Sequence, residues 1–226
     1  MKLIKQGKTK DVYENPDGTY TFKLKDTATG KDGIFDPGEN TVGLSIEGLG
    51  AESLRLSVYF FEMLTKAGIP HQYLASDIAN TMMTVLPAKS FGHGIEFICR
   101  RKADGSFIRR YGAYTQQGTD LDYLIEATIK DDERKDPPIT EEALYLLGIM
   151  TPEEYETCKN LTKKITQLIA DDLAKKGLDL YDIKYEFGIN NGKIILIDEI
   201  SAGSMRAYKN GKPVPPMELG KLILSA

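Results

Sequence analysis

The chain contains no tryptophan, only two cysteines and no long apolar run. Cys99 and Cys158 lie far apart in the sequence and match no metal-binding spacing, so we expect reduced thiols in a cytoplasmic protein. No apolar stretch approaches the ~18 residues that cross a bilayer, and the N-terminal residues lack the apolar core of a signal peptide. The absence of a basic tract argues against a nucleic-acid partner.

The two common nucleotide-binding loops are also missing. The sequence has no Gly-x-x-x-x-Gly-Lys-Ser/Thr segment and no Gly-x-Gly-x-x-Gly segment after a strand. Its 41% apolar and 27% charged residues are ordinary for a globular protein, and its net charge is −4. A length of 226 residues allows one large domain or two small ones. Any phosphate site must therefore be built in another way.

The order of elements predicts an α+β fold with antiparallel sheets. Strand-like runs at 8–13 and 19–24 flank a turn at 15–18, and further strands are expected at 72–74, 81–86 and 95–99. Helices are expected at 52–67 and, with a capping box formed by Thr151 and Glu154, at 151–176. Strands that follow one another, rather than alternating with helices, favour antiparallel pairing.

Two apolar runs near the C-terminus flank Asn190-Asn191-Gly192 and each carries a carboxylate, Glu186 or Asp198. We interpret the turn as a three-residue loop that sets Ile189 opposite Lys193. Glu186 and Asp198 then share a face, where a hard divalent cation that bridges nucleotide phosphates would neutralise them. A two-residue loop would turn Asp198 away, and solvated acids on a surface hairpin are the alternative interpretation.

The same alternation separates a polar and an apolar face on the first run of this hairpin. The polar face carries Asp182, Lys184 and Glu186, and the apolar face carries Ile183, Tyr185, Phe187 and Ile189.

Two clusters of cations suggest phosphate binding. Lys8 and Lys10 would project from one face if they lie on a strand, where anions between them relieve their repulsion; two solvated lysines are the alternative. In the second cluster a strand ends at Arg100, turns at Asp104-Gly105 and continues past Ser106, near further arginines and a lysine. A guanidinium and a hydroxyl beside a glycine turn suit a phosphate monoester, although a basic surface hairpin has the same pattern.

Five ordered motifs together resemble the SAICAR synthetase family. They are Gly7-Lys8-Thr9-Lys10-Asp11-Val12-Tyr13, the segment 96–112, Lys130 with Asp136-Pro137, the segment 182–188, and Asp198-Glu199-Ile200-Ser201. Each motif alone is weak, but their order and spacing match over nearly the whole chain.

The resemblance implies a two-part, ATP-grasp-like fold. Residues 1–87 would form a β-rich nucleotide-binding part, and residues 88–226 a larger α+β part that binds substrate and metal. The resemblance assigns nucleotide binding to Lys8, Lys10, Lys130, Glu186 and Asp198. Of these, Glu186 and Asp198 would hold Mg²⁺. Substrate-binding roles fall on Arg100, Ser106, Asp136 and Arg206, and catalytic roles on Lys184 and Asp182. His93 is expected in a loop, and His71 has no suggested role.

The activity implied by the resemblance is ATP-dependent ligation. The carboxylate of 5-amino-1-(5-phosphoribosyl)imidazole-4-carboxylate would be joined to L-aspartate through an acyl phosphate, giving SAICAR, ADP and phosphate in purine biosynthesis. The partners are therefore small molecules, with no nucleic acid and no membrane. Small members of the family are often dimers, so a homodimer is a candidate assembly.

The sequence departs from the family pattern in the segment 36–43, where the family segment ends in paired asparagines, and at three single positions. Gly203 stands where the family has aspartate, Ala202 where it has proline, and Arg101 where it has asparagine. Gly203 and Arg101 motivate one alternative, a related ligase with a different acid or amine. A phosphotransferase with a hydroxyl acceptor and a nucleotide sensor without turnover are two further alternatives.

Overall fold

The structure is a computed structural model that describes residues 1–39 and 41–225, and the chain forms two compact units. The first unit comprises Met1–Lys89, Gly188–Gly203 and the chain from Pro215 onward, and the second comprises Ser90–Phe187 and Ser204–Val214. The chain thus returns to the first unit through two C-terminal segments. The division into a nucleotide-binding part at 1–87 and a substrate-binding part at 88–226 stays a prediction.

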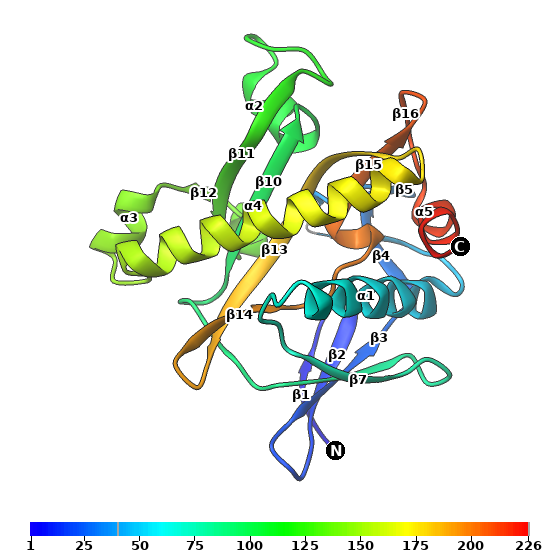
Figure 1. The fold of residues 1–226 in the computed structure, drawn as a ribbon, viewed down its shortest axis with the longest axis vertical. Coiled ribbons are helices and arrows are strands. Elements are labelled where there is room, and N and C mark those ends of the chain that lie inside the picture. Colours follow the sequence, from blue (N-terminus) through cyan, green and yellow to red (C-terminus); the bar gives the residue numbers. More distant parts are fainter. Residues whose placement is uncertain (40, 226) are drawn as a thin grey trace. The chain divides into compact units, whose positions relative to one another are not determined.

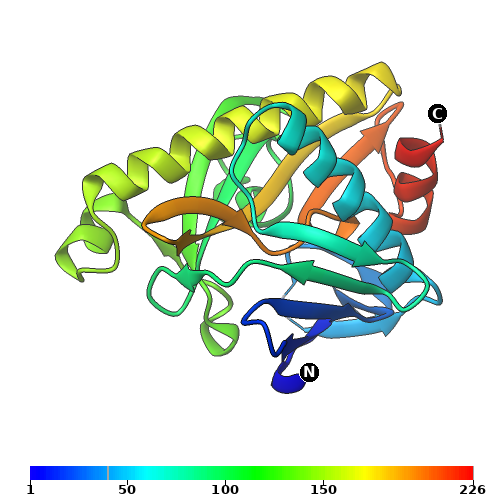
Figure 2. The same ribbon diagram turned by 60° about the horizontal axis from the view of Figure 1, so that its bottom comes forward.

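A five-stranded antiparallel sheet with the order β1-β2-β3-β8-β7 forms the centre of the first unit (Figure 2). Its strands are β1 (Lys2–Gln6), β2 (Lys10–Glu14), β3 (Tyr20–Leu24), β7 (Tyr73–Asp77) and β8 (Met82–Val85). Helix α1 (Leu49–Lys66) packs on β3 and β7, and α5 (Pro216–Leu224) packs on α1. A smaller sheet contains β4 (Thr27–Lys31), β5 (Ile34–Phe35) and β6 (Val42–Ser45).

The predicted N-terminal hairpin and first helix are confirmed. β2 and β3 pair with Val12 opposite Phe22, around the predicted turn. In α1, Leu54, Phe61 and Leu64 are fully buried, because their helical spacing places them on one face.

The second unit contains a sheet with the strand order β12-β11-β10-β13-β15-β16. Its strands are β10 (Ile95–Lys102), β11 (Asp120–Ile129), β12 (Pro138–Ile139), β13 (Asp179–Asn190), β15 (Met205–Lys209) and β16 (Lys212–Pro213). The helices are α2 (Gly105–Tyr111), α3 (Glu141–Leu146), α4 (Pro152–Lys175) and the 3₁₀ turn η1 (Asp132–Arg134). β9 (Lys89–Ser90) and the 3₁₀ turn η2 (Ala202–Ser204) lie where the chain passes between units. The hairpin strand β14 (Lys193–Ile197) belongs to the first unit.

Helix α4 covers the apolar face of this sheet (Figure 1). The Phe97 and Tyr155 ring centroids are 5.5 Å apart, and the Thr166 hydroxyl donates to the Tyr185 hydroxyl at 3.2 Å. The capping box that starts α4 is present as predicted, with both Thr151 and Glu154 bonded. The antiparallel pairing and the mixture of separate sheets and helices confirm the α+β fold class.

The strand predicted to continue past Ser106 is wrong, because this segment forms the helix α2. The Asp104 side chain accepts a hydrogen bond from the Gly105 amide at 2.8 Å and caps the helix start. Side-chain oxygens at this position satisfy amides that the first helical turn leaves without partners. An Asp-Gly pair therefore begins a helix here instead of closing a hairpin.

The three-residue loop predicted between β13 and β14 is also wrong. β13 ends at Asn190 and β14 begins at Lys193, so the loop contains only Asn191 and Gly192. Both have positive φ, 48° and 75°, as a two-residue type I′ turn requires. Asparagine tolerates this conformation better than most residues, which makes the shorter loop available.

In the described part of the chain, no helix has both the length and the apolar character needed to cross a membrane. Cys99 and Cys158 are buried and unpaired, as expected. Burial raises the pKa of Cys99 to about 11 and that of Cys158 to about 12, so both thiols stay protonated near neutral pH.

Candidate active site

A row of charged side chains crosses three strands on the polar face of the second unit's sheet. Arg100 on β10 pairs with Asp182 on β13, which pairs with Arg206 on β15. The two Asp182 carboxylate oxygens accept from Arg206 Nη1 at 3.0 Å each, and one accepts from Arg100 Nη1 at 3.4 Å. Directly opposite residues on one sheet face are close enough to interact, so the pairing register itself assembles this row.

Three further groups surround Arg100. Its Nε donates to Glu126, and its Nη2 donates to the Ser106 hydroxyl at 2.8 Å. Glu126 also accepts from Arg110. The side chain of Arg100 is 1% exposed, against 15% for Arg206. The neighbouring Asp104 carboxylate also acts on Asp182. Three guanidinium groups and a hydroxyl nevertheless supply the hydrogen-bond donors that suit an anion approaching from the side of Ser106 and Arg206.

Gly105 provides the space for the Arg206 guanidinium. A Cβ at this glycine would lie 2.5 Å from Arg206 Cζ, and its φ of +50° is unfavourable for other residues. The start of α2 thus lies directly against the end of the row.

Two lysines of the same region also pair with carboxylates. Lys184 donates to Glu96 at 2.8 Å, and Lys130 forms an ion pair with Glu186. Burial lowers the pKa of Lys184, but the Glu96 charge, the Glu96 hydrogen bond and the Glu186 charge together outweigh burial. The pKa is therefore raised and the ammonium stays charged. The Lys130 stem lies against Gly94, where a Cβ would be 2.8 Å from Lys130 Cδ.

Asp136 has a local role in the structure. Its carboxylate accepts from the Asp131 amide at 2.7 Å, and its φ is +46°. This bond closes the loop around η1 and holds Asp136 in a conformation that few non-glycine residues adopt.

In the first unit, Lys10 lies between two neighbouring carboxylates. Its ammonium forms ion pairs with Asp198 and Glu199, and all three side chains are less than a quarter exposed. The Asp198 carboxylate also accepts from the Glu199 amide at 2.9 Å. Gly7 shapes the turn before Lys10, because a Cβ there would lie 2.5 Å from the Lys10 carbonyl oxygen.

The donor set of this cluster fits a hard cation. Burial, followed by the neighbouring Asp198 charge, raises the pKa of Glu199 to about 7, although Lys10 opposes the shift. Two carboxylates share one ammonium, which leaves a net negative charge beside oxygen donors that suit Mg²⁺. Across residues 1–39 and 41–225, no group of three or more His, Cys, Asp or Glu side chains could hold a metal on its own. Mg²⁺ commonly needs only one or two carboxylates plus phosphates.

The prediction that strand alternation places Asp198 on the same face as Glu186 is wrong, because Asp198 lies outside the strand. β14 ends at Ile197, and Asp198 has a φ of +73°, so strand alternation does not direct its side chain. Glu199, which alternation assigned to the opposite face, instead contacts the same ammonium as Asp198. Its place directly after Asp198 was the available signal. Glu186 belongs to the second unit and Asp198 to the first.

The prediction that Lys8 and Lys10 project from one face of a strand is wrong as well. β2 begins at Lys10, and Lys8 lies in the preceding bend. The Lys8 carbonyl accepts a hydrogen bond from the Thr27 hydroxyl, which ties this bend to β4. The two lysines therefore do not share a strand face.

The structure shows the contacts of two residues at which the sequence departs from the family pattern, Arg101 and Gly203. Arg101 donates to the Leu180 carbonyl at 2.8 Å and to Asp179 at 3.2 Å, so its contacts are with the neighbouring strand and not with Asp182. A Cβ at Gly203 would meet only the Ser201 hydroxyl, at 3.3 Å. None of these contacts is with Arg100, Asp182 or Arg206.

The two histidines lie outside both clusters. His93 is exposed in a turn, as predicted. The His71 Nε2 lies 2.7 Å from the Thr65 hydroxyl, and its ring is 5.1 Å from that of Phe61.

Comparison with known proteins identifies the family. The family model described as SAICAR synthetase matches residues 3–219. A protein of Clostridium tetani named phosphoribosylaminoimidazole-succinocarboxamide synthase is 53% identical over 226 residues, covering 99% of this chain and all of the relative. A protein of Methanoculleus marisnigri with the same name is 36% identical, covering 92% of this chain and 82% of its own.

Solved structures agree with the sequence comparisons. A structure described as SAICAR synthetase (Type-2) in complex with ADP has a TM-score of 0.85 and 26% identity, covering 98% of this chain and 97% of its own. Another, described as protein TM1243 (SAICAR synthetase), has a TM-score of 0.81 and 32% identity, covering 92% and 86%. The chain therefore belongs to the SAICAR synthetase family.

Proposed function

We propose that this chain is an ATP-dependent ligase of purine biosynthesis. It joins the carboxylate of 5-amino-1-(5-phosphoribosyl)imidazole-4-carboxylate to the amine of L-aspartate, and it releases SAICAR, ADP and phosphate. The observation that carries the proposal is the 53% identity to the Clostridium tetani synthase, which extends over 99% of the chain. The ADP complex of a similar structure supports a nucleotide substrate.

The chemistry proceeds in two steps. A carboxylate oxygen of the imidazole substrate attacks the γ-phosphorus of ATP, and ADP leaves with the electrons of the broken bond. The aspartate amine then attacks the acyl phosphate carbon, expels phosphate and loses a proton. No covalent enzyme nucleophile is needed, so the protein contributes mainly positioning and charge neutralisation.

The arginine row of the second unit binds the ribose 5-phosphate. Ser106 and Arg206 offer the more accessible donors, and the buried Arg100 donates a hydrogen bond to Ser106. The guanidinium and hydroxyl donors of the cluster complement a phosphate monoester. Asp182 acts by holding Arg100 and Arg206 rather than by exchanging a proton, and Asp136 shapes the loop at the edge of the substrate site.

Lysines bind the transferring phosphates. Lys8 and Lys10 in the first unit and Lys130 in the second contact the ATP phosphates, and Lys184 neutralises charge on the group being transferred. Their ammonium groups are charged donors suited to phosphate oxygens. An ATP-grasp-like arrangement, with nucleotide binding at 1–87 and substrate binding at 88–226, belongs to this proposal, as do a cytoplasmic location and a homodimer.

Glu186 and Asp198 are the proposed magnesium ligands. The ion would neutralise phosphate charge on ATP while the γ-phosphoryl group is transferred. We expect Glu186→Gln and Asp198→Asn to abolish turnover and to remove the Mg²⁺ dependence of ATP binding in calorimetry, with little change in thermal unfolding. Glu142→Gln, on the exposed side of α3, is the control. Retention of near wild-type turnover in either variant would refute the assignment.

The substrates are tested by an ADP-release assay in which each component is omitted in turn. The proposal predicts ADP and free phosphate only when the imidazole carboxylate and aspartate are both present. ADP release that needs a different acid or amine would instead identify a related ligase. A phosphorylated product without free phosphate would identify a phosphotransferase.

A further inference from the structure

The orientation of the Arg100 guanidinium is set by two carboxylates on opposite neighbouring strands. Nε donates to Glu126 on β11, and Nη1 donates to Asp182 on β13. Only Nη2 is directed elsewhere, to the Ser106 hydroxyl at 2.8 Å. Because the guanidinium is rigid and planar, the bonds of Glu126 to Nε and of Asp182 to Nη1 determine that Nη2 faces Ser106.

Glu126 makes the closer of these two contacts, because the Arg100 bond to Asp182 is 3.4 Å long. The register places Glu126 opposite Ile98, one diagonal step from Arg100 on the same sheet face. Its second carboxylate oxygen accepts from Arg110 of α2, the helix that also carries Ser106. Glu126 thus links the strand that bears Arg100 to the helix that bears its hydroxyl partner.

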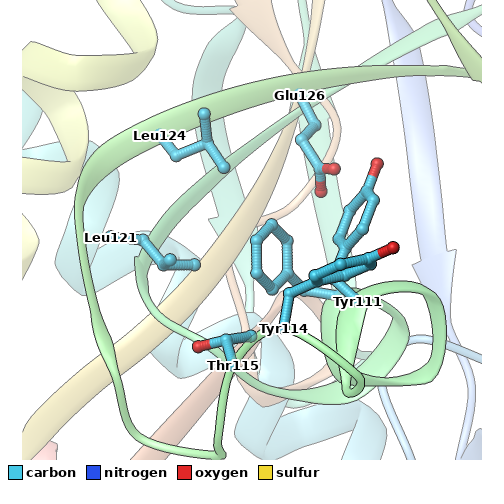
Figure 3. A pocket seen from close by; sticks show the side chains of 7 residues that line it. Tyr111, Tyr114, Thr115, Leu121, Leu124 and Glu126 are labelled. Atoms are coloured by element: carbon cyan, nitrogen blue, oxygen red, sulfur yellow. The ribbon is translucent and has the colours of Figure 1, made fainter.

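Apolar groups lie close to the Arg100 guanidinium. The Phe107 ring lies 5.7 Å from its guanidinium carbon. Figure 3 shows Glu126 pointing from β11 toward Tyr111, at the edge of an open, largely apolar cavity of about 480 Å³. Without the Glu126 carboxylate, the buried Nε–H would lose its acceptor beside apolar groups, and the guanidinium would gain by rotating away.

We propose that Glu126 is a positioning residue for recognition of the substrate's phosphate. It holds Arg100 so that Nη2, together with Ser106, faces the ribose 5-phosphate, and it makes the enzyme discriminate the phosphorylated substrate from its nucleoside. This inference rests on the proposed function of the arginine row and adds a residue that contacts Arg100 rather than the substrate.

The test compares Glu126→Gln, Glu126→Asp and the control Asp120→Asn. Asp120 is an exposed acid on the same strand, and its side-chain oxygen accepts a backbone bond that an amide can also accept. The measurements are KM and kcat for the imidazole ribonucleotide and for its unphosphorylated nucleoside, KM for ATP, and calorimetric binding of ribose 5-phosphate.

Glu126→Gln is expected to raise KM for the ribonucleotide and Kd for ribose 5-phosphate by about 10- to 100-fold, the effect of losing one hydrogen bond between charged groups. KM for ATP and kinetics with the nucleoside should stay unchanged. Glu126→Asp, which keeps the charge, should recover part of the loss, and Asp120→Asn should resemble the wild type.

Equal losses with the ribonucleotide and the nucleoside would overturn the proposal, because a general structural defect affects both. Unchanged binding of ribose 5-phosphate in Glu126→Gln would also overturn it. If the wild-type chain showed no ligase activity, the proposed function would fail, but ribose 5-phosphate binding would still decide the role of Glu126.

Discussion

Lys10 is the residue on which the charge balance of the first unit's cluster depends. Burial lowers its pKa, but the Asp198 and Glu199 charges outweigh burial, so the pKa is raised and the ammonium stays protonated. A neutral side chain at this position leaves two neighbouring carboxylates, both largely buried, without their cation.

Lys10→Met is therefore expected to lower the free energy of unfolding by about 3 kcal/mol, since removing one partner leaves buried charge uncompensated. Urea unfolding without divalent ions measures the difference. Lys2→Met, which removes an exposed lysine from β1, controls for the change in net charge. Equal stability of Lys10→Met and the parent would show that the two acids do not need this ammonium.

His71 gives the molecule a predicted pH dependence. Burial lowers its pKa below the ordinary value of 6.5. The unfolded chain then binds the proton at higher pH than the folded chain does. The contribution of His71 to the free energy of unfolding is therefore fully present above about pH 6.5. It falls as the pH decreases through that value, because the unfolded state takes up the proton.

His71→Gln removes this titration, so its unfolding free energy should depend less on pH than that of the parent between about pH 8 and pH 5. The comparison uses denaturant midpoints at several pH values. His93→Gln removes the chain's only other histidine, from an exposed turn, and is the matched control. Identical slopes for His71→Gln and the parent would contradict the role assigned to His71.

At the scale of elements, the β13–β14 hairpin depends on two residues with positive φ. A Cβ at Gly192 would meet nothing within 4 Å, so a side chain there causes no steric clash with other residues. Its destabilising effect comes from the backbone φ of +75°, which residues other than glycine rarely adopt. Gly192→Ala should reduce the free energy of unfolding by about 1 kcal/mol. Asn191→Gly, in the same loop, should be nearly neutral because glycine accepts its φ of 48°. A loss in Asn191→Gly as large as that in Gly192→Ala would argue against the type I′ turn.

Elements with strong local signals were predictable from the sequence. The start of α4 follows from Thr151 and Glu154, whose side chains each accept from the other's amide, and from Pro152, which has no amide to satisfy. The alternation that separates Asp182 and Lys184 from Ile183 and Tyr185 also holds, because these residues lie well inside β13.

The failures occur where elements end. Asp198 follows the last residue of β14, and Lys8 precedes the first residue of β2, so alternation says nothing about their side chains. Ser106 is the second residue of a helix of only seven residues, which is too short to show helical periodicity. Glu126 and Glu199 were missed because their roles come from partners far away in the sequence.

At the scale of the whole molecule, the charged clusters are divided between the two units. The first unit holds Lys10 with Asp198 and Glu199, and the second holds the arginine row, Lys184 and the Lys130–Glu186 pair. A ligase that activates a carboxylate with ATP needs groups for the nucleotide phosphates and groups for the acid. Membership of the SAICAR synthetase family indicates that the charged groups of both units serve the same ligase reaction.

The central claim is that the substrate carboxylate is activated as an acyl phosphate, and the fate of its oxygen tests this most directly. The imidazole carboxylate is labelled with ¹⁸O and incubated with the enzyme, ATP and aspartate, and the released phosphate is analysed by mass spectrometry. The account predicts that each phosphate carries one oxygen from the carboxylate, because the amine expels the phosphate together with that oxygen. Unlabelled phosphate, or product formation without phosphate release, would contradict it.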